Sequence, residues 1–340
     1  MAHRHFRRTN VPNGSPVAPH MAIYYHRHIA CTLAWRNLQI SSKDMEKIGF
    51  AATIGTFDGV HRGHQFVLRQ LADQSQRHAV KPMVITFDRS PRQEPVLTPL
   101  AEKLRLIHEM GIEHTEVLSF TPELKAMTAY EFMEKVLRNR FDVKLLLTGY
   151  DNRFGRNREE GFNDYIEYGH KLGITVISLP AEGNVSSSHI RQLLTAGHVT
   201  EAADCLGHYY TISGQIGYGE HVGTSLGFPT ANLEPDDVHQ LIPAWGAYAV
   251  KVKTPNGIAN GMMNIGTRPT FGHHAPTLEV HLLNRHENLY GQEISVAFIS
   301  RLREERRFES AKALQEQLNY DAIMAEKEIK ANEERYHLSL

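Results

Sequence analysis

The chain has 340 residues, of which 41% are apolar and 22% charged, the composition of an ordinary globular protein long enough for two domains. The formal net charge of −1 excludes a general electrostatic attraction to nucleic acid or to an anionic membrane surface. The two cysteines, Cys31 and Cys205, lie far apart and provide neither a disulfide framework nor a metal cluster, which suits a reducing cytoplasm.

The N-terminal residues 1–22 are rich in His, Arg, Pro and Asn and contain no apolar run, which predicts a disordered extension. Met21 offers a second possible start. The apolar stretch from Ile29 to Trp35 is too short to cross a membrane and is poorly flanked for a signal peptide. We therefore expect no membrane partner and a cytoplasmic location.

From about Ile48 to Pro180, short apolar runs alternate with helical patterns, which predicts a parallel, Rossmann-like α/β sheet with right-handed crossovers. A helix is expected over residues 98–110, and Thr128 forms a capping box with Glu131 at the start of another. Ligands of such sheets bind outside the carboxyl ends of the strands. The expected strands are residues 51–54, 84–87, 117–120, 145–147 and 174–179.

The segment IGTFDGVHRGH, residues 54–64, leads from the first expected strand through a glycine-rich turn into a helix. Glycine lets the backbone approach a ligand closely, and the N-terminus of a helix attracts phosphate. Because His61 and His64 are three residues apart, both imidazoles face one side of the first helical turn and can neutralise charge developing on a triphosphate. The nucleotide-binding residues expected in the turn are Gly55, Thr56, Phe57, Asp58 and Gly59.

Two other interpretations of this His pair stay open from the residues alone. Histidines at this spacing are often surface residues without a role, and the chain contains 21 of them. The pair can also be half of a zinc site, although no HExxH motif and no nearby Cys supplies further ligands. The position between a strand and a helix favours nucleotide binding.

A polar loop, GYDNRFGRNR, directly follows the expected strand 145–147, at the edge of the sheet where ligands bind. Its arginines can contact phosphate, and its Asp and Asn side chains can hydrogen-bond a ribose or a base. A solvated loop is about equally consistent with this composition. The candidates for nucleotide binding are Asp151, Phe154 and Gly155.

The segment SSSHIR, residues 186–191, precedes a short expected helix. Serine hydroxyls at such a position are most often plain N-caps. They can also donate to a phosphate beside the guanidinium group of an arginine. Because this is the third phosphate-binding candidate in the same half, the balance shifts toward phosphate binding, with Ser186, Ser187, Ser188 and Arg191 as the candidate residues.

In the second half of the chain, short strands with period-two alternation predict a small antiparallel barrel. The TPNG sequence at residues 254–257 indicates a turn, and residues 311–335 are expected to form a terminal helix. We place the domain boundary near residues 197–208, which gives domains of residues 23–200 and 201–340. The expected strands are residues 248–252, 262–265, 278–283 and 294–299.

Within the expected barrel, the segment GFPTAN ends in a Thr hydroxyl and an Asn carbonyl two residues apart, hard oxygen ligands that Mg²⁺ accepts beside phosphate oxygens. A turn that closes a strand is the alternative. The preceding glycine-rich run lacks the Lys-Ser/Thr ending of a Walker loop, which leaves a flap over phosphates as its possible role. The candidate metal ligands are Thr230 and Asn232, and the candidate nucleotide-binding residues are Gly219, Gly223, Gly227, Phe228 and Pro229.

One carboxylate of the barrel is a candidate for proton transfer. Glu279 lies between Leu278 and Val280 in an expected strand, so it points to the opposite face from both. A carboxylate in that position either is solvated or lines a cavity, where it can accept a proton from an attacking hydroxyl during phosphoryl transfer. The strand pattern alone favours the solvated alternative.

Taken together and in this order, these segments resemble the bifunctional prokaryotic riboflavin kinase/FMN adenylyltransferase (FAD synthetase) family from about residue 48 to 330. The motifs already quoted carry the resemblance, together with GAY at 246–248, NIGTRPTF at 264–271, EVHL at 279–282 and LYG at 289–291. Two positions depart from the family pattern. Ser188 stands where Thr is usual and keeps the hydroxyl, whereas Asn152 stands where Phe is usual and lacks an aromatic ring.

The resemblance implies two consecutive reactions with ATP as co-substrate. The barrel would phosphorylate riboflavin to FMN, with Thr230 and Asn232 holding Mg²⁺ and Glu279 accepting the proton of the riboflavin hydroxyl. The α/β half would then transfer AMP to FMN, giving FAD and pyrophosphate. There the resemblance assigns triphosphate binding and transition-state stabilisation to His61 and His64, with Ser187 and Arg191 closing from the other side.

Two different functions compete with this assignment. One is a class I aminoacyl-tRNA synthetase-like nucleotidyltransferase with an RNA-binding barrel, because an HxGH motif and a serine-rich loop also occur in that superfamily. The other is a binding module in which the basic segment at residues 301–307 contacts RNA, although its interleaved glutamates favour a solvated face. We expect small-molecule partners, no nucleic acid, and a monomer or weak homo-oligomer.

Overall fold

The computed structural model describes residues 49–88, 94–149, 152–183, 185–217, 228–267, 276–285, 287–332 and 335. The expected extension over residues 1–22 lies outside these ranges, and so do four candidate site residues, Asp151, Gly219, Gly223 and Gly227. All elements described below belong to one unit of the chain, Gly49–Leu340.

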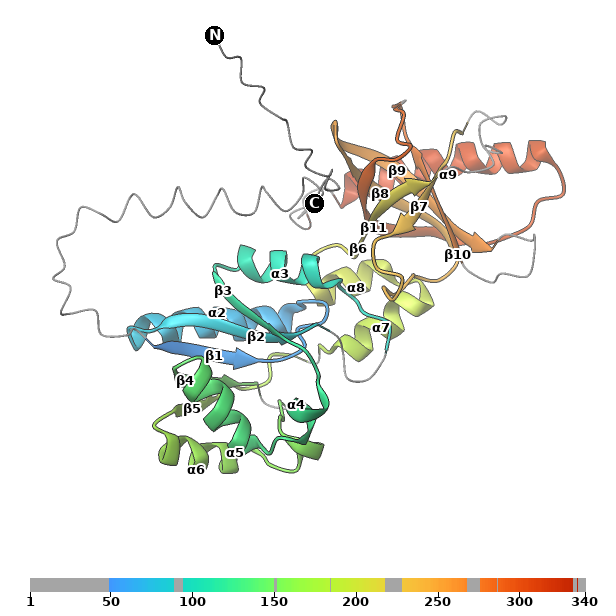
Figure 1. Cartoon of the computed structure of the whole chain (residues 1–340). Helices are drawn as coiled ribbons and strands as arrows, with labels where there is room; N and C mark the ends of the chain where they lie inside the picture. Colours follow the sequence, from blue (N-terminus) through green and yellow to red (C-terminus); the bar gives the residue numbers. More distant parts are fainter. Residues whose placement is uncertain are drawn as a thin grey trace, which may run out of the picture. The chain divides into compact units, whose positions relative to one another are not determined.

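The first half of this unit contains a five-stranded sheet in the order β3-β2-β1-β4-β5, in which every neighbouring pair is parallel (Figure 1). The predicted Rossmann-like arrangement is therefore confirmed. The third strand ends at Leu118, so Ser119 and Phe120, which the sequence pattern places in it, follow it instead. The strands are β1 (Phe50–Ile54), β2 (Lys81–Phe87), β3 (His114–Leu118), β4 (Val143–Thr148) and β5 (Thr175–Ser178).

Helical segments cover both faces of the sheet because successive strand residues point to opposite sides. In β4, Leu145 and Leu147 pack with α2 and α3, whereas Leu146 packs with η2 and α6, which explains why the whole run is apolar. The helical segments are α2 (Arg62–Arg77), α3 (Leu100–Glu109), α4 (Pro122–Ala126), α5 (Ala129–Phe132), the π-helical η2 (Met133–Arg140), the 3₁₀ turn η3 (Arg156–Arg158), α6 (Phe162–Leu172), α7 (Ser187–Ala196) and α8 (Val199–Leu206).

The second half forms a closed barrel in the strand order β10-β7-β6-β11-β8-β9, as the short alternating strands predict. Alternate residues fill its hydrophobic core, among them Leu278 and Val280 of one strand and Val250 of another. The neighbouring barrel strands for which a register is defined pair antiparallel. The strands are β6 (Thr211–Gly217), β7 (Ala231–Pro235), β8 (Gly246–Thr254), β9 (Gly257–Thr267), β10 (Pro276–Leu282) and β11 (Glu293–Glu304).

The terminal helix α9 (Ala311–Ala331) covers part of the outer face of the barrel (Figure 1). Its Ala325 and Ile329 belong to a buried cluster with Met262 of β9. The helix begins where the sequence predicts, after the N-cap Ser310, whose side chain accepts a hydrogen bond from the backbone of Ala313. It ends at Ala331, four residues before the predicted end at 335.

The loop between β2 and α3 joins the sheet half to the barrel half. The backbone N–H of Val96 donates to the carbonyl of His239, and the N–H of Leu241 donates to the carbonyl of Val96, both at 2.9 Å. The side chain of Leu97 is buried in the core cluster of the barrel, and Gln240 donates to the Leu97 carbonyl at 3.3 Å. The loop that follows β2 of the sheet half is therefore held by the barrel half.

Candidate active sites at the sheet edge and on the barrel

The turn between β1 and α2 brings the two motif histidines together at the start of the helix. His61 is the N-cap of α2, and its Nδ1 accepts a hydrogen bond from the backbone N–H of His64 at 3.3 Å. The two imidazole rings stack with centroids 3.6 Å apart and an interplanar angle of 17°. The sequence spacing therefore places both rings on one side of the first turn, beside the free N–H groups of the helix.

The surroundings of His64 keep its imidazole neutral. Burial lowers the pKa of His64 well below its usual value, and the nearby His61 and Lys103 lower it further. Its Nδ1 is buried and has no hydrogen-bond partner among the described residues. A buried polar atom without a partner is costly, so this nitrogen is a group that a ligand can satisfy.

The backbone of the turn is strained at two positions. Phe57 has a φ of +48° and Val60 a φ of +37°, values that L-residues rarely adopt and that are least favourable for a β-branched side chain such as valine. Strain of this kind costs about 1–3 kcal/mol per residue and persists only where the surrounding structure enforces it. The neighbouring contacts must therefore hold the turn in this shape.

Side chains from other elements supply these contacts by hydrogen-bonding the carbonyl oxygens of the turn. Lys103 Nζ donates to Thr56 O at 3.1 Å, and Ser187 Oγ donates to Asp58 O at 2.9 Å. The remaining contacts are Asn152 Nδ2 to Ile54 O, His208 Nε2 to Gly59 O at 3.1 Å, and Gln65 Nε2 to Val60 O at 2.9 Å.

Asp58 is the charged centre of this network. Its buried carboxylate accepts hydrogen bonds from the backbone N–H groups of Leu97 at 2.9 Å and Thr98 at 3.1 Å, and it forms an ion pair with Arg191. Burial raises the pKa of the Asp58 carboxyl, and the charge of Arg191 opposes that shift. Arg191 also donates to Pro95 O at 2.9 Å, so in this structure it is directed toward Asp58 and the loop before α3.

The three consecutive serines have different surroundings. Ser186 is the N-cap of α7 and accepts a hydrogen bond from the backbone N–H of His189 at 3.2 Å. Ser187 donates to the turn, and Ser188 is exposed. The start of α7 therefore lies beside the β1–α2 turn, so two of the segments that the sequence assigns to phosphate meet there. Asn152 of the third segment also reaches the start of this turn, through its hydrogen bond to Ile54 O.

In the third segment, Phe154 is packed inside the sheet half. Its ring stacks on Tyr165 with centroids 4.2 Å apart and contacts Phe132 in the same hydrophobic cluster. Gly155 has a φ of +91°, and a Cβ there would lie 2.7 Å from the backbone nitrogen of Ala129. Both residues thus have a structural reason for their identity, and their role in nucleotide binding stays a prediction.

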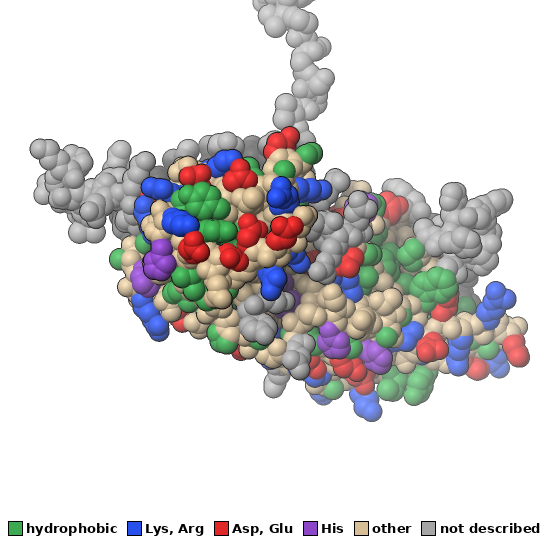
Figure 2. Space-filling view, turned by 90° about the horizontal axis from the view of Figure 1, so that it is seen from below, with side chains coloured by type: hydrophobic (Ala, Val, Ile, Leu, Met, Phe, Trp, Pro, Cys, Tyr) green, Lys and Arg blue, Asp and Glu red, His purple; other side chains and the backbone are tan. Residues whose placement is uncertain are grey.

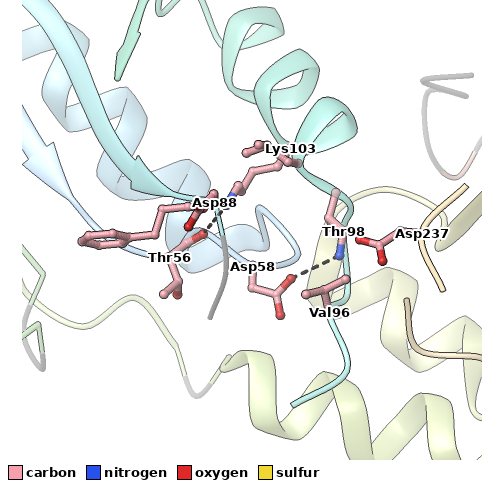
Figure 3. Close-up of a pocket in the computed structure, with 9 residues that line it drawn as sticks. Thr56, Asp58, Asp88, Val96, Thr98, Lys103 and Asp237 are labelled. Atoms are coloured by element: carbon pink, nitrogen blue, oxygen red, sulfur yellow. Dashed lines mark hydrogen bonds between the residues drawn. The ribbon is translucent and has the colours of Figure 1, made fainter. Parts of the chain in front are cut away.

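A pocket opens beside the turn at the carboxyl edge of β1 and β2 (Figure 3). Its lining includes Thr56 and Asp58, which the sequence analysis assigns to the nucleotide, whereas His61 and His64 are not among its described lining residues. The full lining is Thr56, Asp58, Phe87, Asp88, Val96, Thr98, Leu100, Lys103 and Asp237.

Lys103 is a member of this pocket that the sequence analysis missed. It lies three and four residues before Leu106 and Ile107, on the apolar face of α3, and a lysine in that register is the signal that could have identified it. It is only 6% exposed. Burial lowers its pKa to about 8, although Asp58 and Asp88 act in the opposite direction.

On the barrel, the register aligns three candidate residues across adjacent strands. Glu279 of β10 lies opposite Asn232 of β7 on one side and Asn264 of β9 on the other. Because Leu278 and Val280 face the core, this row points to the outer face and not into the barrel. Carboxylate and amide oxygens in one row, with Thr230 immediately before β7, fit the oxygen ligands that Mg²⁺ prefers.

The segment before β7 contacts the same face of the barrel. The ring of Phe228 meets His281 of β10 edge-on at 5.1 Å, and His281 Nδ1 lies 2.8 Å from the carbonyl oxygen of Pro229. His281 is two residues after Glu279, so both side chains belong to the outer face. The GFPTAN segment, from Phe228 onward, is therefore held next to the row that contains Glu279.

Arginines of residues 301–307, the basic segment of the RNA-binding alternative, form hydrogen bonds and an ion pair with other parts of the chain. Arg301 donates to the carbonyl oxygens of Ala196 and Trp245, and Arg303 Nε pairs with Asp321 at 2.8 Å. Arg306 contacts Gln317 of α9. Positive and negative side chains are interspersed on the face seen in Figure 2. None of the described helices is long and apolar enough to span a membrane.

Comparison with known proteins finds the same two activities in the same order. The family model described as FAD synthetase matches residues 43–190, and the model described as riboflavin kinase matches residues 206–329. The bifunctional riboflavin kinase/FMN adenylyltransferase of Escherichia coli K12 is 36% identical over 292 residues, which cover 82% of this chain and 92% of that protein. Its namesake from Pseudomonas fluorescens is 34% identical, with coverages of 82% and 93%.

A solved structure shares the whole architecture. The crystal structure described as a macrolide-efflux protein from Streptococcus pneumoniae superposes with a TM-score of 0.76 at 28% sequence identity. The match covers 84% of this chain and 96% of that one. The sheet and the barrel therefore also occur together in this chain of known structure.

Proposed function

We propose that this chain, which belongs to the family of bifunctional riboflavin kinase/FMN adenylyltransferases, phosphorylates riboflavin with ATP and then adenylylates the FMN that it has made. The barrel carries out the first reaction and the sheet half the second. The observation that supports this most strongly is the presence of two separate clusters of candidate residues. One surrounds the β1–α2 turn, and the other is the row through Glu279 on the barrel.

In the kinase reaction, the oxygen of the terminal ribityl hydroxyl forms a bond to the γ-phosphorus of ATP, and the bond to ADP breaks. Glu279 accepts the hydroxyl proton, which is the role of a positioned carboxylate at that step. Thr230 and Asn232 hold Mg²⁺, which neutralises charge on the phosphate oxygens when it is bound. The register that puts Asn232 beside Glu279 supports this assignment.

In the adenylyl transfer, an oxygen of the FMN phosphate attacks the α-phosphorus of a second ATP, and pyrophosphate leaves. No covalent enzyme intermediate is required, so positioning and electrostatic stabilisation supply most of the rate. His61 and His64 lie at the start of α2, where the free N–H groups also attract phosphate. Ser187 and Arg191, at the start of α7, contribute hydroxyl and guanidinium donors from the other side of the turn.

We extend the proposal to the organisation of the chain. Residues 23–200 form the adenylyltransferase domain and residues 201–340 the kinase domain. The enzyme acts in the cytoplasm as a monomer or weak homo-oligomer on small molecules, without nucleic acid. The near-zero net charge and the internal pairing of Arg301 and Arg303 support the last point.

The test is incubation of the purified chain with riboflavin, ATP and Mg²⁺, followed by chromatographic separation of the flavins. The proposal predicts FMN first and FAD afterwards. A flavin that stays unchanged would overturn both assignments, and accumulation of FMN alone would overturn the second. Amino-acid-dependent exchange of pyrophosphate into ATP would instead support the synthetase-like alternative.

A further inference from the structure

The side chain of Lys103 connects the ends of two neighbouring strands. Its ammonium group donates to the carbonyl of Thr56, two residues after β1, at 3.1 Å, and to the carbonyl of Phe87, the last residue of β2, at 2.8 Å. These two strands are adjacent and parallel, so both carbonyls lie at the carboxyl edge of the sheet. One cation thus holds the point where the chain leaves β1 to enter the motif turn.

These hydrogen bonds lie at the start of the strained part of the turn. Thr56 O belongs to the peptide group immediately before Phe57, whose φ of +48° is the first strained angle of the turn. Thr86 Oγ1 also donates to this oxygen, at 3.3 Å. The lysine therefore acts on the segment that leads to His61 and His64 from a different element, α3.

A buried lysine in this position lowers the stability of the fold. The ammonium group is almost fully buried, and its desolvation outweighs the attraction of Asp58 and Asp88. A methionine or leucine would fill the same space on the apolar face of α3 without that cost. A buried charge that destabilises the protein and lies in a pocket beside a binding turn is most readily explained by a role in function.

We propose that Lys103 is a positioning residue of the adenylyl-transfer site, whose protonated side chain holds the β1–α2 turn in the shape that presents the two histidines to ATP. This inference rests on the proposed function of the sheet half. Lys103 acts through the turn and is not assigned a contact with substrate. Its loss should therefore lower kcat for FAD formation more than it raises KM for ATP.

Because the proposed role of Lys103 requires its charge, the proposal predicts how FAD formation depends on pH. The titratable groups around it are Asp58 in the turn, Asp88 after β2 and His64, which stays neutral. Asp237, from the barrel half, lines the same pocket. With a pKa of about 8, Lys103 loses its proton as the pH rises through that value. Deprotonation weakens both charge-assisted hydrogen bonds, so FAD formation should decline above about pH 8.

The experiment measures FAD formation from supplied FMN between about pH 6.5 and 9.5 for the wild type, Lys103→Met, Lys103→Arg and the control Lys81→Met. Lys81 is exposed and begins β2, at the opposite edge of the sheet. We expect Lys103→Met to lower kcat at least about tenfold and to lack the alkaline decline. Lys103→Arg should keep more activity and move the decline to higher pH, and Lys81→Met should match the wild type.

Two results would overturn the inference. One is a Lys103→Met variant with kcat within about twofold of the wild type, and the other is a slow variant that keeps the same alkaline decline. Circular dichroism and the unfolding temperature report whether the sheet half of each variant is folded, which FMN formation in the barrel half does not. If Lys103→Met is unfolded, an unshifted decline in Lys103→Arg overturns the inference instead. A wild type that makes no FAD at any pH contradicts the proposed function itself.

Discussion

Glu279 lies directly opposite Asn232 across two antiparallel barrel strands, on the face that points away from the barrel core. Side chains at directly opposite positions of a ladder are close neighbours, so a candidate proton acceptor and a candidate metal ligand lie next to each other. The side chain of Glu279 is half-buried, whereas the strand pattern alone favours a fully solvated side chain. The two residues come from segments that are 47 positions apart in the sequence (279 − 232).

Replacement of Glu279 by Gln should remove the proton acceptor of the kinase and leave the shape of the strand unchanged. We expect FMN formation to fall about 10²–10⁴-fold, the usual contribution of general base catalysis, while FAD formation from supplied FMN persists. Chromatography of the flavins measures both. Glu234→Gln is the control, because Glu234 is an exposed carboxylate on the same face of β7 as Asn232. Parallel loss of both activities would contradict the two-site account.

Replacement of His64 by Ala should have the opposite effect on the two reactions. The neutral, half-buried imidazole is stacked on His61 at the start of α2, where the triphosphate is expected. We expect FAD formation to fall about 10²–10³-fold, as for the loss of one preorganised transition-state donor, and FMN formation to be unchanged. His78→Ala, at the exposed C-terminal end of the same helix, is the matched control. An unaltered FAD yield would refute the role of His64.

Removal of one partner of the buried ion pair between Asp58 and Arg191 should destabilise the protein far more than removal of one partner of an exposed pair. Asp58→Ala leaves the guanidinium group poorly compensated and two backbone N–H groups without their acceptor, so we expect a cost of about 3–5 kcal/mol. Asp204→Ala removes an exposed pair with Arg335 and should cost no more than about 1 kcal/mol. Urea denaturation measures the free energy of unfolding of both variants, and equal costs would contradict the central role of Asp58.

Two glycines with positive φ should differ in how strongly they resist a side chain. Gly173 has left-handed helical geometry, whereas Gly155, at φ +91° and ψ +167°, lies in a region that essentially only glycine occupies. Gly155→Ala places a Cβ 2.7 Å from the backbone of Ala129, whereas Gly173→Ala, at the C-terminus of α6, meets nothing within 4 Å. We expect about 1–2 kcal/mol of destabilisation for Gly173→Ala and clearly more for Gly155→Ala. Thermal unfolding of the two variants gives this comparison. Equal losses of stability would contradict a special requirement for glycine at position 155.

The elements with strong periodic patterns could be predicted from the sequence. The apolar runs identified the sheet strands, and the TPNG turn joins β8 to β9, where Thr254 pairs with Gly257. The sequence analysis did not identify β6 and β7, because Gly214, Gly217 and Pro235 interrupt their alternation. Those strands exist because the closed barrel pairs them with their neighbours, which is a tertiary effect that local propensity does not contain.

The candidate sites could be located from motifs, but their internal contacts could not. The spacing of His61 and His64 places both rings together because they share one helical turn. The hydrogen bonds of Lys103 form because α3 lies beside the segment that follows β1. No local sequence pattern predicts this contact. Phe154 is an aromatic residue in a polar loop, a pattern that also describes a binding residue, and its packing on Tyr165 emerges only from the fold.

The central claim is that two independent ATP sites share this chain, and isotope tracing tests it most directly. The enzyme is given riboflavin, Mg²⁺ and ATP labelled with ³²P at either the γ- or the α-phosphate, and the flavins are separated. We predict that the γ-label enters FMN and is retained in FAD. Of the flavins, only FAD should carry the α-label, and the pyrophosphate released from α-labelled ATP should be unlabelled. A γ-label that never reaches flavin, or an α-label that appears in FMN, would contradict the account.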